Sequence, residues 1–455
     1  MSTTDTKTSQ WTIARQPITT EPVQNSSPQY YTGSAITANF DNFDSNKMTI
    51  SGNVATTVGT HTATITPKAN YKWASGGGAD GTESKTFDWV ISEPPYKTMT
   101  AIIDLSNSNP ATCVTYADDA TSMTAKSSAW DTFFGHYPVM LNNGVEGKKL
   151  NPNNFAQDVN GNAVDITSGS AGDVMIAFPR RGLKITTSGN KITISMTDNP
   201  NDANFKYYAH QRGNIQKEKF YLGAYKGYKD GNSKLRSLSG KTPTANQTIG
   251  TFRTQAHNLG SGYENSGFYQ LTFRQCMYIL KYKNLNSQAT VGMGNCNASS
   301  LQNTGGTNTK GMDWGESTGK QQMKLFGLED FNGNIYEWID GLVTNSNRNM
   351  LTATDNFNDS GSGYTNQGQG ASSNIENFMS KPQGTTETGF IAKEVSGSST
   401  TYFCDYASLY ASCVARFGDH WNAGSSGAGS GVFMLFVHDG ASGSSSYVGA
   451  RLMYL

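Results

Sequence analysis

The chain has 455 residues, and its 35 basic and 35 acidic side chains give a formal net charge of zero. This balance indicates neither a nucleic acid nor an anionic membrane as a partner, because phosphate binding needs an excess of basic residues on one face. Only 15% of the residues are charged and 49 are glycine, a composition typical of a turn-rich protein that is mainly β with some α-helix (α+β). At this length we expect two or three domains.

The N-terminal segment 1–27 is polar, has no hydrophobic periodicity and contains Pro17 and Pro22. We expect it to form an extended arm, which is either a disordered leader or an attachment segment. It lacks the apolar stretch of a secretory signal peptide, and no run of about 18 apolar residues occurs in the chain. These features predict synthesis in the cytoplasm without a signal peptide, and no membrane insertion.

Short segments of alternating apolar and polar residues follow in 28–95, separated by Gly, Asn and Asp turns at intervals of roughly 8 to 12 residues. This pattern predicts a small β-sandwich with Trp73 and Trp89 in its core, and the SEPPY sequence at 92–96 predicts a stiff boundary. The segment 30–92 resembles the immunoglobulin-like repeats of bacterial and phage proteins. That resemblance implies an immunoglobulin-like domain that acts as a spacer, with carbohydrate binding as the alternative.

The region 96–165 begins with an apolar strand at 100–105. A short helix follows, which Ser127 or Ser128 can cap and which Gly135 can end. The region resembles the segment that precedes the lectin-like domain of gut-phage tail proteins. We therefore expect a connector or oligomerisation region here.

Two strand pairs are predicted farther along the chain. The residues of 173–197 alternate around a turn at 188–190, which indicates a hairpin. A second pair is predicted in 219–238, around an Asp-Gly-Asn turn.

One amphipathic helix and one long loop are also predicted. Apolar residues recur at helical spacing from Phe273 to Leu280, with Thr272 near the expected start. This spacing places Cys276 in the core rather than in a catalytic role. The segment 344–401 is rich in Gly, Ser, Asn and Thr and poor in apolar residues, so we expect a long irregular loop that frames a binding face.

The last forty residues, 416–455, mix two kinds of position. Large apolar residues and glycines have the properties of a scaffold, because they pack or permit positive φ. These scaffold positions are Gly418, Trp421, Gly424, Gly431, Phe433, Leu435, Gly449, Arg451 and Leu452. The positions between them share no periodicity, size or polarity, as is typical of a ligand-binding surface whose chemistry varies over a fixed backbone. These predicted ligand-binding positions are Asp419, His420, Asn422, Ala423, Met434, Phe436, His438, Asp439, Ser444, Ser446 and Tyr447.

A second block, GLEDFNGNIYEW at 327–338, is followed by the R-x-G-x-x-W pattern of 416–421 and a terminal G-x-RL at 449–452. Together these motifs resemble the formylglycine-generating-enzyme (sulfatase-modifying factor) version of the C-type-lectin fold. The GDHWN, GVFMLFVHDG and VGARL sequences of the ending are similar to those of variable proteins diversified by diversity-generating retroelements, which include phage tropism determinants. The resemblance implies a C-type-lectin-like domain at 166–455 with a variable binding region at 416–450.

This resemblance implies a phage tail-tip receptor-binding protein, carried on the virion, whose hypervariable face serves host attachment and adhesion. Its partners would be a host cell-surface receptor, either protein or glycan, and other phage tail proteins, and the symmetry of tail fibres predicts a homotrimer. The segment 1–27 would then attach the protein to the particle. Two alternatives stay open: a diversified bacterial surface protein that binds ligands, and a formylglycine-generating-enzyme-like oxidase.

The oxidase alternative needs a reactive cysteine pair close to the R-x-G-x-x-W block. Cys404 and Cys413, which are candidates for a disulfide, precede that block and lie nine residues apart, whereas the redox pair of the family is closer in spacing and lies farther along. We therefore expect no enzymatic activity.

Calcium is the one candidate cofactor, and none is expected to be required. In the resembled family, the positions that match Asp330 and Glu337 bind calcium through side chains, and those that match Gly333 and Ile335 bind it through carbonyl oxygens. Such a hard cation takes about six to eight oxygen ligands. The alternative is that these groups only hydrogen-bond the turn.

Two histidines of the variable region, His420 and His438, each stand beside an aspartate. They are candidate metal ligands, although the chain has no His-x-x-x-His spacing. Direct contact with a ligand is the simpler interpretation.

Overall fold

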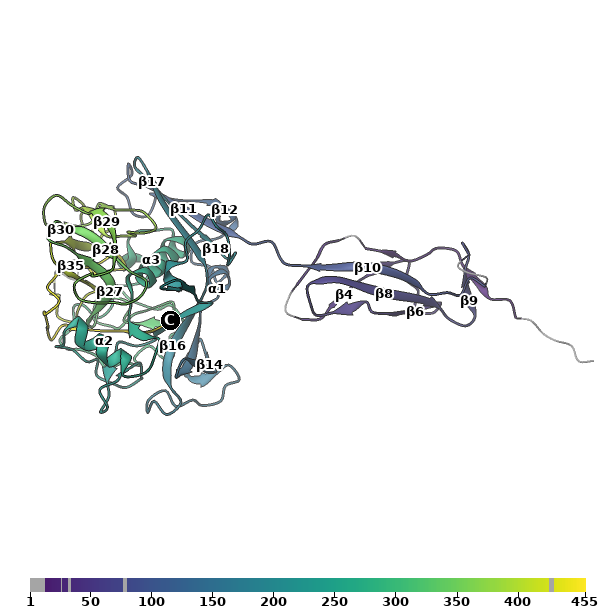
Figure 1. Ribbon diagram of the computed structural model, residues 1–455, viewed down its shortest axis with the longest axis horizontal. Helices are drawn as coiled ribbons and strands as arrows, with labels where there is room; N and C mark the ends of the chain where they lie inside the picture. The colour runs from purple at the N-terminus through teal and green to yellow at the C-terminus, as the bar shows by residue number, and fades with distance from the viewer. Residues whose placement is uncertain (1–12, 26, 32–33, 77–79, 425–428) are drawn as a thin grey trace, which may run out of the picture. The chain divides into compact units, whose positions relative to one another are not determined.

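The computed structural model of the protein describes residues 13–25, 27–31, 34–76, 80–424 and 429–455 (Figure 1). The chain forms two compact units, Met1–Tyr96 and Lys97–Leu455, here called unit 1 and unit 2. Strands far outnumber helices, so the protein is mainly β, as its composition predicts. Within the described residues, no helix is both long and apolar enough to cross a membrane.

Unit 1 is built from short strands. Their bounds are β1 Gln16–Ile18, β2 Val23–Gln24, β3 Gln29–Tyr30, β4 Ile36–Thr37, β5 Phe40–Asp41, β6 Met48–Ser51, β7 Val54–Ala55, β8 Gly59–Pro67, β9 Tyr71–Trp73 and β10 Lys85–Ser92. The main sheet has the order β3-β10-β8-β6, and the pairs β1-β9, β2-β5 and β4-β7 form separate small sheets. Trp73 and Trp89 are buried in two hydrophobic clusters, and their indole N–H groups donate to backbone carbonyls. Their burial confirms the predicted core aromatic residues.

The expected N-terminal arm is in part a component of unit 1. β1 pairs in parallel with β9, with Gln16 opposite Tyr71, and β2 pairs with β5. Glu21, between these two strands, forms an ion pair with Lys85 at 2.6 Å. The arm prediction is therefore wrong for the segment from β1 to β2, where backbone pairing to distant strands replaces local periodicity. Residues 1–12 of that arm lie outside the described residues.

Unit 2 contains three larger sheets. The first two are built from β11 Thr98–Asp104, β12 Val114–Asp118, β13 Tyr137–Asn142, β14 Val145–Asn151, β15 Asn154–Asp158, β16 Asp173–Pro179, β17 Gly182–Ser188, β18 Lys191–Thr197, β21 Lys219–Gly223, β24 Tyr263–Asn265 and β37 Leu452–Tyr454. Their orders are β12-β11-β18-β17 and β15-β14-β13-β16-β21-β37-β24. The last strand of the chain, β37, thus lies inside the second sheet between β21 and β24.

The third sheet carries most of the C-terminal region. It is built from β27 Tyr336–Thr344, β28 Asn349–Thr352, β29 Thr365–Gln369, β30 Ile375–Phe378, β33 Tyr406–Leu409, β34 Val414–Phe417, β35 Leu435–Asp439 and β36 Val448–Gly449. Its order is β29-β28-β27-β34-β35-β33-β30, with β36 parallel to β27. Four small pairs complete the strands: β19 Gln211–Arg212 with β20 Ile215–Gln216, β22 Tyr228–Lys229 with β23 Leu235–Arg236, β25 Lys324–Leu325 with β26 Leu328–Glu329, and β31 Lys381–Pro382 with β32 Ala392–Glu394.

The helices of unit 2 are few and mostly short. Those that lie wholly within the described part of the chain are α1 Ala129–Phe134, α2 Ile249–His257, α3 Phe268–Tyr282 and α4 Ser287–Thr290, together with the 3-10 turns η1 Asp119–Ser122 and η2 Tyr208–His210. Every residue of α3 is buried, and the helix lies between the first sheet and the third (Figure 1). This is the predicted helix, but it begins about one turn earlier than expected, at Phe268 instead of near Thr272. Gly267 is its N-cap residue. Cys276 is buried in its middle, as predicted.

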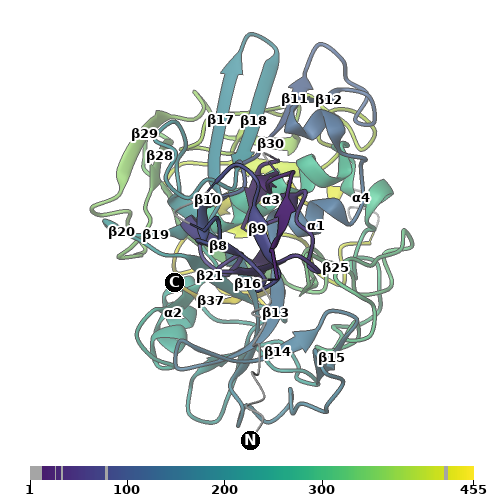
Figure 2. The same cartoon turned by 90° about the vertical axis from the view of Figure 1, so that its right-hand side faces the viewer.

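Three further local predictions are confirmed. The hairpin β17–β18 turns through Gly189 at φ +60°, and β22 pairs with β23. Helix α1 follows Ser128 and ends at Gly135, whose left-handed conformation suits glycine. The hairpin β17–β18 lies at one end of unit 2 and β14 at the other (Figures 1 and 2).

Residues 96–165 do not form a separate connector. β11 pairs with β18 along its whole length, from Thr98 opposite Thr197 to Asp104 opposite Lys191, and β13 pairs with β16. The second unit therefore begins at Lys97 rather than at 166. These pairings join segments that are distant in the chain, which local sequence patterns do not reveal.

Residues 344–401 are not one long irregular loop. The segment contains β28, β29 and β30, which are strands of the third sheet, and the pair β31–β32. The side chains of β29, with sequence TNQGQ, are mostly exposed. An edge strand of this kind carries no apolar alternation that would mark it as a strand.

Candidate binding face

The predicted variable region supplies two neighbouring strands of the third sheet. Arg416 of β34 stands opposite Trp338 of β27 and opposite Phe436 of β35. Directly paired residues point to the same side of a sheet, as do residues two apart in one strand. Tyr336 and His438 therefore share this side with Arg416, while the other side of the same strands packs into the main core.

Arg416 lies at the centre of this side of the sheet. Its guanidinium carbon lies 4.4 Å from the ring centroid of Tyr336 and 5.5 Å from that of Phe436. The same guanidinium donates to Nε2 of His438 at 2.8 Å and pairs with Asp439 at 3.2 Å. Cation–π contacts with two rings and polar contacts with His438 and Asp439 thus fix the Arg416 side chain.

A row of rings continues from Tyr336 to the segments that flank the strands. The ring of His420 stacks on Tyr336 with centroids 5.4 Å apart and lies 4.2 Å from Tyr447, which in turn lies 5.8 Å from Trp421. Asp419 orients His420, since its Oδ1 accepts the backbone N–H at 2.8 Å and lies 3.1 Å from the ring Nδ1. We name the following set the binding face: Tyr336, Arg416, His420, Trp421, Phe436, His438 and Tyr447, with the segments 418–424 and 440–447.

At its far end the face reaches two residues that the sequence did not indicate. The ring of Tyr410 lies 5.7 Å from that of His438, and its hydroxyl donates to Glu376 at 2.8 Å. Glu376 also lies 3.6 Å from Nδ1 of His438. Tyr336 and Arg416 were likewise missed, although strand alternation beside Glu337 and Phe417 was a signal that could have found them.

The structure divides the predicted ligand-binding positions by exposure. The exposed ones are Asn422, Ser444 and Ser446. The half-buried ones are His420, Ala423, His438, Asp439 and Tyr447. The buried ones are Asp419, Met434 and Phe436, with 1%, 4% and 5% of their surface exposed. The last three therefore do not offer freely exchangeable surface.

The burial of two aromatic residues is the reverse of the expectation. Phe436 was expected on the surface, but its ring belongs to a buried hydrophobic cluster and is covered by Tyr336 and His438. Trp421 was expected in the core, yet it is half-buried and its ring contacts Tyr447. Phe436 is thus a floor residue of the face, and Trp421 lies at its rim.

On the other side of β27, Glu337 anchors the scaffold. Its fully buried carboxylate receives Arg451 Nε at 2.8 Å, Lys226 Nζ at 3.2 Å and Arg274 Nη2 at 3.3 Å. Burial alone would raise the pKa of Glu337, but the three cations hold it well below its usual range. Arg451 also donates to three backbone carbonyls. The network ties β27, α3 and the end of the chain together.

Most of the groups expected to bind calcium have other partners here, and Oδ1 of Asp330 is buried without a hydrogen-bond partner. Both carboxylate oxygens of Glu337 face cationic side chains, next to which a divalent cation would be repelled. Oδ2 of Asp330 accepts from the side-chain amides of Gln322 and Asn334, and the Gly333 carbonyl accepts the N–H of Ile335. Among the described residues, no group of three or more His, Cys, Asp or Glu side chains could hold a metal. The donor set therefore does not fit the calcium site that the resemblance implies.

All five cysteines are unpaired and buried. Burial raises the pKa of Cys404 to about 12 and that of Cys413 to about 11, so both thiols stay protonated near neutral pH. The candidate disulfide between them is not formed. Buried, protonated thiols do not make the accessible thiolate that cysteine redox chemistry uses.

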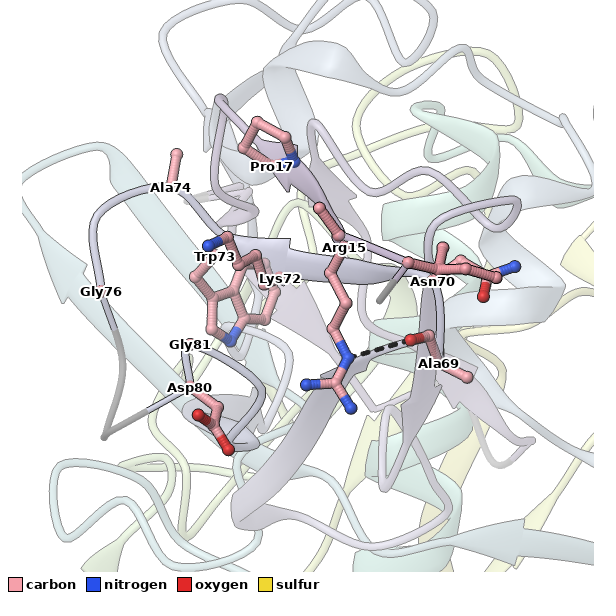
Figure 3. A pocket seen from close by; sticks show the side chains of 12 residues that line it. Arg15, Pro17, Ala69, Asn70, Lys72, Trp73, Ala74, Gly76, Asp80 and Gly81 are labelled. Carbon is pink, nitrogen blue, oxygen red and sulfur yellow. Dashed lines mark hydrogen bonds between the residues drawn. The ribbon is translucent and has the colours of Figure 1, made fainter. Parts of the chain in front are cut away.

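Unit 1 carries a hollow of about 750 Å³ (Figure 3). Arg15 lies across it and its Nε donates to the carbonyl of Ala69 at 3.0 Å. Lys72 and Asp80 line the same hollow. None of the ligand-binding or calcium positions predicted from the sequence lies there.

Comparison with known proteins adds no relative: no protein-family pattern matches the chain, and no curated protein is similar to it.

Proposed function

We propose that the protein is a receptor-binding protein of a phage tail tip, which attaches the virion to a host cell through the binding face. In this proposal unit 1 is an immunoglobulin-like spacer and unit 2 is a C-type-lectin-like domain of the formylglycine-generating-enzyme type. The observation that carries the proposal is the composition of the face: clustered rings and one guanidinium, flanked by exposed Asn and Ser side chains.

A largely buried scaffold holds the two segments of the binding face. Segment 418–424 follows directly on β34, and segment 440–447 connects β35 to β36, and all three of these strands are largely buried. The Glu337–Arg451 contact holds β27 next to the end of the chain. The exposed side chains Asn422, Ser444 and Ser446 on these segments can therefore change without loss of a core contact, which is the property that a diversified binding surface requires.

The residues of the face suit binding better than turnover. His420 and Tyr447 present polar rings at half-buried positions, and Asn422, Ser444 and Ser446 are exposed in the same two segments. Central aromatic anchors among small polar side chains are the composition of antibody paratopes and of interface hot spots. We therefore propose a host protein or glycan as the ligand, bound without chemical change.

Multiple copies would strengthen such binding. In our proposal the protein forms a homotrimer that contacts other tail proteins, and several faces on one particle turn weak contacts into high avidity. Light scattering of the purified chain measures its oligomeric state. Immunogold labelling distinguishes a tail protein, found on particles, from the alternative of a diversified bacterial surface protein, found on uninfected cells.

The direct test is binding of the fluorescently labelled chain to a panel of bacterial strains, measured by flow cytometry. We expect Tyr447→Ala and His420→Ala to weaken binding to a positive strain by at least about tenfold, as for central interface residues. The matched control is Tyr30→Ala, which removes a 44% exposed tyrosine of unit 1. Full binding by both face variants, or a panel without any positive strain, would contradict the proposal.

A further inference from the structure

A second concave surface of unit 2 lies outside the binding face. It consists of three adjoining hollows of about 380, 490 and 440 Å³. The first and second share Tyr208 and Gln211 as wall residues, and the second and third share Asp355 and Asn356. Because the second hollow shares wall residues with both of the others, the three adjoin in a row, and we call them together the groove.

Tyrosine rings fixed by their neighbours line the middle of this groove. Half-buried Tyr208 packs on Tyr269 with ring centroids 4.8 Å apart, and the Tyr269 hydroxyl lies 2.9 Å from Oγ1 of Thr352. Tyr364 also lines the groove, and its hydroxyl accepts the backbone N–H of Asn358 at 2.8 Å. The rings are therefore preorganised, and a flat ligand ring can stack on Tyr208 without first ordering it.

Hydrogen-bonding groups lie around these rings. Asn214 and Asn356 are exposed in the groove, and no hydrogen bond within the described part of the chain engages either side-chain amide. Glu387 lies 3.4 Å from the Tyr208 hydroxyl. Amides and a carboxylate next to an aromatic platform can pair with the vicinal hydroxyls of a sugar while its C–H face stacks on the ring.

The charge of the groove excludes anionic polymers. Arg212 already pairs with Glu264 at 2.9 Å and with Asp355 at 3.2 Å. Glu387 and Asp202 add two further negative charges to the groove, and Lys206 in the first hollow adds one positive charge. Phosphate-rich or sulfated chains need the opposite balance, and the many amide and carboxylate groups disfavour a lipid or an amphipathic helix.

We propose that this groove binds a neutral linear oligosaccharide, with Tyr208 as the stacking platform and Asn214, Asn356 and Glu387 as partners for its hydroxyls. The main competing ligand is an extended peptide that adds to the edge strand β29, which borders the same groove. The elongated shape fits several sugar rings in a row. This site is independent of the receptor-binding proposal, because it shares no residue with the binding face.

The test measures binding of neutral hexasaccharides, namely cellohexaose, xylohexaose, mannohexaose and chitohexaose, to the full chain by titration calorimetry. We expect at least one to bind, Tyr208→Ala to weaken it by roughly tenfold, and Tyr208→Phe to retain it. Asn214→Arg, at an exposed position that leaves the core intact, should block the groove and also reduce binding. Thermal unfolding of each variant verifies that it is folded.

The control variant is Tyr447→Ala on the binding face, which should bind the hexasaccharide as the unaltered chain does. The proposal is overturned if no hexasaccharide binds, or if folded Tyr208→Ala and Asn214→Arg bind normally. It is also overturned if Tyr447→Ala alone loses the sugar, or if an extended polar peptide binds in a manner sensitive to Asn214→Arg while no sugar does. None of these outcomes tests the receptor-binding proposal, which the cell-binding assay tests separately.

Discussion

Replacing Arg451 should test how strongly the buried ion network holds unit 2. Arg451→Met keeps an unbranched apolar stem but removes the guanidinium that contacts Glu337 at 2.8 Å and donates to three backbone carbonyls. Removal of one partner from a buried pair costs about 3–5 kcal/mol. Lys226 and Arg274 still compensate the Glu337 charge, but the three carbonyls lose their donor, so we expect a loss within that range.

The assay is chemical denaturation followed by tryptophan fluorescence and by calorimetry, which can separate the transitions of the two units. Unit 1 does not contain the network, so its transition serves as an internal reference. The control is Lys148→Met, which removes a cation that is 58% exposed and 3.9 Å from Asp158, and should cost at most about 1 kcal/mol. If Arg451→Met cost no more than this control, the network would not be the anchor of the scaffold.

Three further predictions follow from burial and charge. Burial and the nearby Glu329 raise the pKa of Asp330 to about 7, above its unfolded value near 3.9. The folded state therefore binds a proton that the unfolded state has lost, and stability should fall as pH rises from about 4 to about 7. Asp330→Asn should flatten this fall in melting temperature, whereas an unchanged pH profile would refute the assignment. Phe436→Ala should cost about 3–5 kcal/mol of unfolding free energy, while Trp421→Ala should fold with a smaller loss and weaken cell binding. Denaturation measures the first effect and flow cytometry the second, and the opposite result for the two variants would contradict the prediction. Sequencing sibling copies of the gene should find changes concentrated at the exposed positions such as Asn422 and Ser444 rather than at buried Phe436, and an even spread of changes would count against diversification.

Local signals in the sequence predicted the elements that depend on neighbouring residues. The hairpin β17–β18 has apolar alternation and a Gly turn, and α3 has helical spacing of apolar residues that all turned out to be buried. The burial of Trp73 and Trp89 followed from alternating strands in the same way. In each case the pattern that marks the element lies within a short stretch of the chain, even where its packing partners are distant.

The remaining structure depends on contacts between distant residues. β11 finds its partner β18 nearly a hundred residues later, so the supposed connector could not be recognised as part of unit 2. Glu337 meets Arg451 across 114 residues, and this pairing gave the carboxylate a role that its calcium-like motif did not indicate. Phe436 looked exchangeable because its neighbours vary in character, but the rings of Tyr336 and His438, which lie far from each other in the chain, cover it.

In the function that we propose, a fixed scaffold carries an exchangeable binding surface. The most direct test is a displayed library of the full chain with saturation mutagenesis, sorted separately for protease resistance and for binding to a positive bacterial strain. Our account predicts that substitutions at Asn422, Ser444 and Tyr447 preserve protease resistance and change binding, while those at Glu337 and Phe436 abolish protease resistance. Loss of folding at the first group, or normal folding with altered binding at the second, would contradict it.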